Sequence, residues 1–139
     1  MCLGVYFAAA APLGTIDWTP EHPVFNVAGL TEHEEPVRRQ FSQPHIYYLG
    51  SHTRCGCGFQ ADGDGDPAAG GRSRAALAAY VGAARRMGPA ELFVCWEGDY
   101  AVAPGQRLRL MPAELGSAAE WTQELTFVEI LEAAAPAIP

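Results

Sequence analysis

The sequence contains no lysine, and its nine basic residues are all arginines, against 16 acidic residues. The formal net charge is therefore -7. Proteins that bind nucleic acid or anionic lipid usually present clustered Lys and Arg side chains, because these neutralise phosphate groups. The shortage of positive charge argues against nucleic acid as a partner. The absence of lysine, with abundant Ala, Gly and Pro, is typical of a protein from a GC-rich bacterial genome.

Long hydrophobic runs are also missing. No apolar run approaches the roughly 20 residues that a transmembrane helix requires, and the apolar start MCLGVYFAAAAPLG lacks the basic residues of a secretory signal. These absences predict a cytoplasmic protein with no membrane partner. In that compartment we expect the four cysteines, at positions 2, 55, 57 and 95, to be thiols or metal ligands and not a disulfide framework.

What is present is an alternation of short apolar strands with two helical segments. The 139 residues fit one domain, 1–139, and the hydrophobic share of 49% suffices for a folded core. Strands are predicted over 2–8, which is apolar on both faces, and over 23–30, 45–50, 55–60, 91–98, 107–111 and 124–131; helices are predicted over 31–41 and 72–87. This order predicts an α+β two-layer sandwich, with a mixed or antiparallel sheet and two main helices on one face.

The stretch SHTRCGCGFQ, residues 51–60, contains the principal candidate site. Its four polar residues predict the turn of a hairpin between 45–50 and 55–60, with Tyr47 opposite Gly58. Residues two apart on a strand share a face. The hairpin would therefore present the sulfurs of Cys55 and Cys57 on one side.

Two thiolates on one face could bind a soft metal ion, and His52 is the nearest further ligand in the sequence. Zinc is the candidate ion, because structural zinc sites use four Cys or His ligands. The H-x-x-C-x-C spacing matches no familiar zinc-finger pattern, and the chain has no second cysteine pair of the C-x-x-C type. The first hypothesis is therefore a metal site formed by Cys55, Cys57 and His52, with the fourth ligand open.

Two alternatives for the same stretch stay open. In one, the glycines shape a tight hairpin and the cysteines act as small buried hydrophobic residues. In the other, Cys55 or Cys57 is a reactive or redox thiol, because Arg54 and His52 lie close enough in the sequence to lower a cysteine pKa.

Residues outside this stretch add two further candidates. The start Met-Cys resembles that of N-terminal-nucleophile amidotransferases, which implies a nucleophilic role for Cys2; a buried strand cysteine is the simpler interpretation. Glu97 and Asp99 follow a predicted strand at the place where catalytic acids often lie, although exposed strand ends commonly carry such residues too.

The Met-Cys start, the segment VRRQFSQPHIYYLGSHTRCGCGF and the segment ELFVCWEGD are together similar to a family of short bacterial proteins with an SHxxCGCGF motif. The resemblance implies one domain and brings no activity, cofactor or partner. A metal site at the hairpin is thus the first hypothesis. A thiol-dependent enzyme or redox protein using Cys55, Cys57 or Cys2 is the second, and a structural or interaction module is the third. The sequence leaves open a small-molecule or protein partner and a homo-oligomer.

Overall fold

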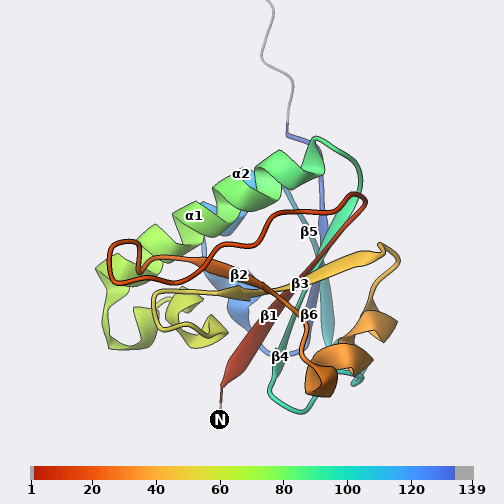
Figure 1. Ribbon diagram of the computed structural model, residues 1–139, viewed down its shortest axis with the longest axis horizontal. Coiled ribbons are helices and arrows are strands. Elements are labelled where there is room, and N and C mark those ends of the chain that lie inside the picture. Colours follow the sequence, from red (N-terminus) through yellow and green to blue (C-terminus); the bar gives the residue numbers. More distant parts are fainter. Residues whose placement is uncertain (1, 134–139) are drawn as a thin grey trace, which may run out of the picture.

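Six strands form one mixed sheet in the computed structural model, which describes residues 2–133 (Figure 1). The strands are β1 (Leu3–Ala9), β2 (Asn26–Gly29), β3 (His45–Gly50), β4 (Ala90–Trp96), β5 (Gln106–Leu110) and β6 (Thr126–Ile130). Their order is β2-β3-β1-β4-β6-β5, and all neighbours are antiparallel except β5 and β6. The predicted α+β fold with a mixed sheet is confirmed.

Strand β1 lies inside the sheet, between β3 and β4, and all seven of its residues are buried. Its sequence LGVYFAA has no charged side chain, as expected of a strand that is covered on both faces. Because side chains alternate along a strand, Leu3, Val5 and Phe7 face one layer, whereas Tyr6 and Ala8 face the other. Both faces of the sheet therefore carry a core.

Helices α1 (Pro67–Arg85) and α2 (Pro112–Ser117) cover the first face. Leu77 and Val81 of α1 pack there with Leu115 of α2, and all three are fully buried. The two main helices on one face are therefore α1 and α2. Helix α1 begins five residues before the predicted start, because Asp66 caps it by accepting a hydrogen bond from the Ala69 N–H and Pro67 suits its first turn.

The segment predicted as the other helix, 31–41, lies on the opposite face of the sheet as the 3-10 helix η1 (Glu32–Gln40). Its start follows the sequence signal: the Glu34 carboxylate accepts hydrogen bonds from the N–H and the hydroxyl of Thr31, both at 2.9 Å. Pro36 lies inside the element and cannot donate a backbone hydrogen bond, which disfavours a regular α-helix. Val37 of η1 packs into the second core.

The predicted hairpin is wrong. Residues 56–59 form the 3-10 turn η2 (Gly56–Phe59), and both edges of β3 are occupied by β1 and β2. Tyr47 is opposite Phe7 and Gly29, and not opposite Gly58. A second 3-10 turn, η3 (Gly63–Gly65), links η2 to α1, and a third, η4 (Glu120–Thr122), precedes β6.

The glycines of η2 allow the turn to approach the sheet closely. A Cβ atom on Gly56 would lie 2.7 Å from the Leu3 carbonyl oxygen, closer than real side chains come. A Cβ atom on Gly58 would collide with the Ser51 hydroxyl. The alternation of Gly and Cys therefore reflects packing of a turn against the start of β1. None of the helices within residues 2–133 is long and apolar enough to cross a membrane.

Candidate functional site: a cysteine cluster beside a cavity

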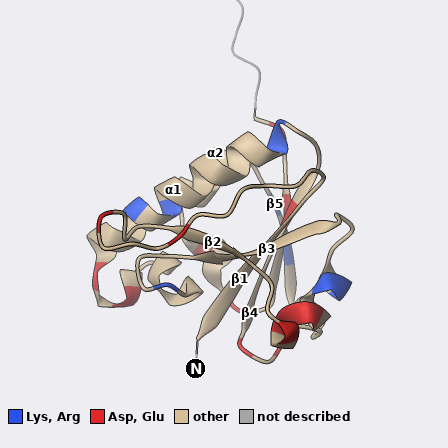
Figure 2. Ribbon diagram, viewed as in Figure 1, with Lys and Arg blue, Asp and Glu red and all other residues tan. Residues whose placement is uncertain are grey.

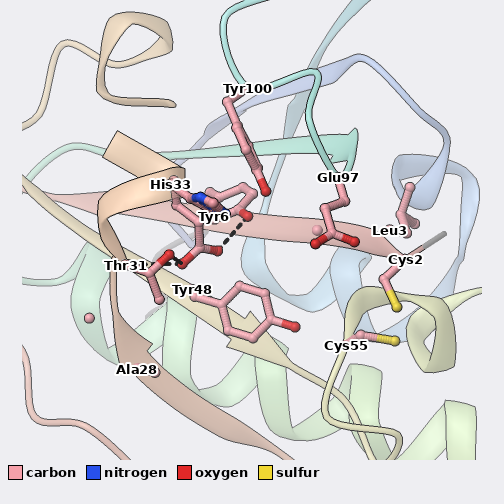
Figure 3. Close-up of a pocket in the computed structure, with 13 residues that line it drawn as sticks. Cys2, Leu3, Tyr6, Ala28, Thr31, His33, Tyr48, Cys55, Glu97 and Tyr100 are labelled. Carbon is pink, nitrogen blue, oxygen red and sulfur yellow. Dashed lines mark hydrogen bonds between the residues drawn. The ribbon is translucent and has the colours of Figure 1, made fainter. Parts of the chain in front are cut away.

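Three of the four cysteines meet where η2 packs against the start of β1. Cys2 immediately precedes β1, and Cys55 and Cys57 lie at the start of η2. The Leu3 N–H points at Cys57 Sγ, at 3.3 Å. Figure 3 shows the sulfurs of Cys2 and Cys55 lying next to each other. The fold thus joins Cys2 to the cysteine pair, an approach that no local sequence signal could reveal.

The loop 51–54 holds Cys55 in place. The Ser51 N–H and hydroxyl both donate to the Cys55 carbonyl oxygen, at 3.0 and 2.6 Å. The Arg54 backbone has φ 70°, a left-handed conformation that turns the chain sharply before Cys55. The Tyr48 hydroxyl donates to the Arg54 carbonyl oxygen at 2.7 Å. These contacts fix the backbone on which the Cys55 thiol is carried.

Hydrogen bonds favour the thiolate form of Cys55. Its partial burial by itself would raise the pKa, but hydrogen bonds from the Thr53 hydroxyl, the Cys57 backbone N–H and the thiols of Cys57 and Cys2 outweigh it. The pKa of Cys55 therefore lies below that of an ordinary cysteine. The Thr53 Oγ1 atom is 3.4 Å from Cys55 Sγ.

The other three thiols are shifted in the opposite direction. The negative charge of Cys55 and the hydrogen bond donated to it raise the pKa of Cys2. Burial raises the pKa of Cys57 to about 11, and burial also raises that of Cys95 to about 12. Cys95 lies in the second core and not with the other three. Cys55 is therefore the preferred thiolate of the chain.

A cavity of about 390 Å³ opens beside Cys2 and Cys55 (Figure 3). It lies on the face of the sheet that η1 covers, and β1, β2, β3, η1 and the loop after β4 all contribute to its lining. No two of these elements are joined by a short hairpin, so the cavity is a product of the tertiary fold. The volume is in the range of small-molecule sites.

Three tyrosines form a connected group in the cavity lining. The ring centroid of Tyr6 is 5.8 Å from that of Tyr48 and 5.9 Å from that of Tyr100, and both contacts are edge-to-face. The Tyr6 hydroxyl donates to Glu34 Oε2 at 2.6 Å. Burial, followed by the neighbouring Glu34 carboxylate, raises the pKa of Tyr6, and burial also raises the pKa of Tyr48 and Tyr100. All three therefore stay protonated at neutral pH.

Two carboxylates complete the lining. Glu34 lies at the start of η1, and Glu97 lies at the exposed rim directly after β4. The Glu97 N–H donates to the Cys2 carbonyl oxygen at 2.9 Å, which ties the rim to the cysteine cluster. The sequence signal of an acid at a strand end therefore located Glu97, whereas Asp99 does not line the cavity.

The His52 side chain contacts Ser73 of α1. Its Nδ1 atom is 3.1 Å from Ser73 Oγ, and its backbone N–H donates to the same hydroxyl, which in turn donates to the Val24 carbonyl oxygen. Among residues 2–133, no group of three or more His, Cys, Asp and Glu side chains is arranged to hold a metal ion. The predicted ligand set of Cys55, Cys57 and His52 is thus not assembled, and these residues do not fit zinc.

Arg54 does not act on the thiols either. Its guanidinium group stacks on the Trp18 ring, 3.8 Å from the centroid. The groups that lower the pKa of Cys55 are hydrogen-bond donors and not the predicted positive charges of Arg54 and His52. The partners that the sequence predicted for these cysteines are therefore replaced by hydrogen-bond donors.

Comparisons with known proteins give no further guidance, since no family model, no curated protein and no solved structure matches the chain.

Proposed function

We propose that the chain is a thiol–disulfide exchange protein, in which Cys55 attacks a disulfide bound in the cavity and Cys2 resolves the intermediate. The observation that carries this proposal is the placement of the Cys2 and Cys55 sulfurs side by side at the edge of the cavity. The depressed pKa of Cys55 supports its role as the attacking thiolate, because the thiolate is the nucleophile in thiol–disulfide exchange.

The reaction has two exchange steps. The Cys55 thiolate attacks one sulfur of a substrate R–S–S–R′, forms a mixed disulfide with it and releases R′S⁻, which takes up a proton. Cys2 then loses its proton and attacks Cys55 Sγ, so that a Cys2–Cys55 disulfide forms and RS⁻ leaves. The substrate gains two electrons and the two cysteines lose them.

Cys2 suits the resolving role better than Cys57. Cys2 is exposed and lines the cavity, whereas Cys57 packs against the core under α1 and its sulfur accepts the Leu3 N–H. A resolving thiol has to move toward the attacked sulfur to form a bond of about 2.05 Å. The position of Cys2 ahead of β1 permits that movement with less loss of packing.

The cycle requires a reductant for the Cys2–Cys55 disulfide. An external dithiol would return both cysteines to the thiol form and become a disulfide itself. The cytoplasm, the compartment that the sequence predicts, maintains such reductants. All four cysteines are free thiols in the structure, which is the state that begins the cycle.

Peptide mapping after reaction with a small disulfide tests the proposal. We expect bis(2-hydroxyethyl) disulfide to convert the folded protein to a Cys2–Cys55 disulfide. The variant Cys2→Ser should instead accumulate a mixed disulfide at Cys55, while Cys57→Ser should still form the Cys2–Cys55 bond. Modification of Cys55 only after unfolding, or a bond between Cys55 and Cys57 in the wild-type protein, would contradict the proposal.

A further inference from the structure

The cavity beside Cys55 combines negative charge with aromatic rings, and we infer that it recognises a small substrate through a positively charged ammonium group. This inference names the substrate class of the proposed exchange reaction and rests on that function for its chemical step. The binding part rests on the lining of the cavity alone.

Acidic side chains predominate over basic ones in the lining. Glu34 and Glu97 contribute carboxylates, His33 is the one basic side chain, and no Arg is found among the described residues that line the cavity. Figure 2 shows acidic segments on η1 and on the loop after β4 at this end of the sheet. Cys55 adds a further negative charge when it is a thiolate. A partly enclosed site strengthens these interactions relative to bulk water, so an anionic substrate is disfavoured and a cation is attracted.

The tyrosines supply the second element of cation recognition. Tyr6, Tyr48 and Tyr100 present neutral aromatic rings to the same cavity. An ammonium group is attracted to the electron-rich face of an aromatic ring, and aromatic cages bind such ligands in many proteins. The edge-to-face contacts hold the three rings in fixed relative orientations. Little ordering is therefore needed when a ligand enters.

Glu34 is positioned before any ligand binds. Its Oε1 atom accepts two hydrogen bonds from Thr31 and its Oε2 atom accepts one from Tyr6. These three hydrogen bonds hold the Glu34 carboxylate in place within the cavity. Glu97 at the rim is exposed, and it lies on the side of the cavity next to Cys2 (Figure 3). This arrangement places negative charge both inside the cavity and beside the thiols.

The cavity size limits the substrate to a small molecule. About 390 Å³ is near the lower end of the range of ligand pockets, which favours a short aminoalkyl group over a peptide domain. A disulfide that carries such a group would place its ammonium near the carboxylates and its sulfur near Cys55. The same ammonium would further stabilise the Cys55 thiolate through its positive charge.

Three small disulfides that differ mainly in charge test the inference. The probes are bis(2-aminoethyl) disulfide, bis(2-hydroxyethyl) disulfide and 3,3′-dithiodipropionate, which are cationic, neutral and anionic. The measurement is the rate of Cys55 modification at low salt, divided by the rate of the same probe with a cysteine peptide. We expect the order cationic, neutral, anionic, with a ratio of about tenfold or more between the extremes. Added salt should reduce this ratio.

Matched variants locate the effect. Glu97→Gln should lower the rate with the cationic probe relative to the rate with the neutral probe, because it removes a negative charge from the rim while Cys55 stays in place. Glu32→Gln, an exposed acid of η1 outside the lining, is the control and should preserve the selectivity. Equal normalised rates for the three probes, or the same loss in both variants, would overturn the inference while leaving the exchange function intact.

Binding without reaction separates the two proposals. In the variant Cys55→Ser, calorimetry should detect binding of tetramethylammonium and little binding of tert-butanol, its neutral counterpart of similar shape. Adding the substitution Tyr48→Leu to this variant should weaken the binding of tetramethylammonium, because it removes one of the aromatic rings. If Cys55 reacts with none of the disulfides, the exchange function fails, and the calorimetric result alone decides the cation site. Equal binding of tetramethylammonium and tert-butanol would refute the cation site.

Discussion

The two faces of the sheet are built from the same strands and differ in what covers them. On the face of α1 and α2, Leu77, Val81 and Leu115 pack against β1 and are fully buried. On the face of η1, the same strand contributes Gly4 and Tyr6 to the lining of a cavity. A single strand with alternating side chains therefore supports a closed core on one side and a candidate site on the other.

The size of the alternating residues explains the difference. The first face of β1 carries Leu3, Val5 and Phe7, which fill the space below the helices. The second face begins with Gly4, where a Cβ atom would lie 2.8 Å from the Tyr6 ring. The missing side chain leaves room for that ring to lie over the strand. Along β1 the helix face is therefore fully packed, whereas the other face combines a core with a cavity beside two of the thiols.

The largest expected effect concerns the helix face. Leu77→Ala should lower the free energy of unfolding by about 2–5 kcal/mol, because it removes a fully buried side chain and leaves a void. Chemical denaturation measures this change, and Met87→Ala, at an exposed position, serves as the control. Alkylation of Cys55 in the folded variant should keep its rate. A clear loss of Cys55 alkylation in the folded Leu77→Ala variant would break the comparison.

Ser73 tests whether His52 belongs to the core or to the site. Ser73→Ala removes the hydroxyl that contacts both His52 and Val24 and should cost about 1–3 kcal/mol of stability, since it leaves buried polar groups unpaired. The rate of Cys55 alkylation should not change. Ser42→Ala, which removes an exposed hydrogen bond to Glu91, should cost less. A changed Cys55 rate would show that the His52 contacts reach the thiols.

Thr53 offers the smallest and most local test. Thr53→Val keeps the side-chain shape but removes the hydroxyl next to Cys55 Sγ, so the pKa of Cys55 should rise and its alkylation at neutral pH should slow. Thr53→Ser retains a hydroxyl and should preserve the rate. Stability should change by about 1 kcal/mol or less in both variants. An unchanged alkylation rate in Thr53→Val would show that this hydrogen bond does not lower the pKa of Cys55.

Most of the fold followed from local sequence patterns. The apolar run at 2–8 predicted a strand inside the sheet, which the structure places at 3–9, and the Thr31–Glu34 spacing predicted the start of η1. The turn η2 could not be predicted in this way. Alternation of Gly and Cys is compatible with a strand, and the need for Gly56 arises only from its approach to the Leu3 carbonyl oxygen.

The candidate site was predictable only in part. The CGCGF stretch and the acid at the end of β4 carried visible signals, and both contribute to the site through Cys55 and Glu97. The meeting of Cys2 with Cys55 depends on how η2 packs against β1, which joins segments more than fifty positions apart. His52 was assigned to the site by nearness in sequence, but its Nδ1 atom contacts the hydroxyl of Ser73 of α1.

The most direct test of the thiol assignment is the alkylation rate of each cysteine as a function of pH. Folded wild-type protein is treated with iodoacetamide between about pH 6 and pH 10, a range that brackets the ordinary cysteine pKa, and each site is quantified by mass spectrometry. Thiolate increases as pH rises through the pKa. Cys55 should therefore reach its half-maximal rate at a lower pH than a cysteine peptide, whereas Cys57 should remain slow until the pH approaches about 11. A half-maximal pH for Cys55 at or above that of the peptide, or faster reaction of Cys57 at neutral pH, would contradict the account.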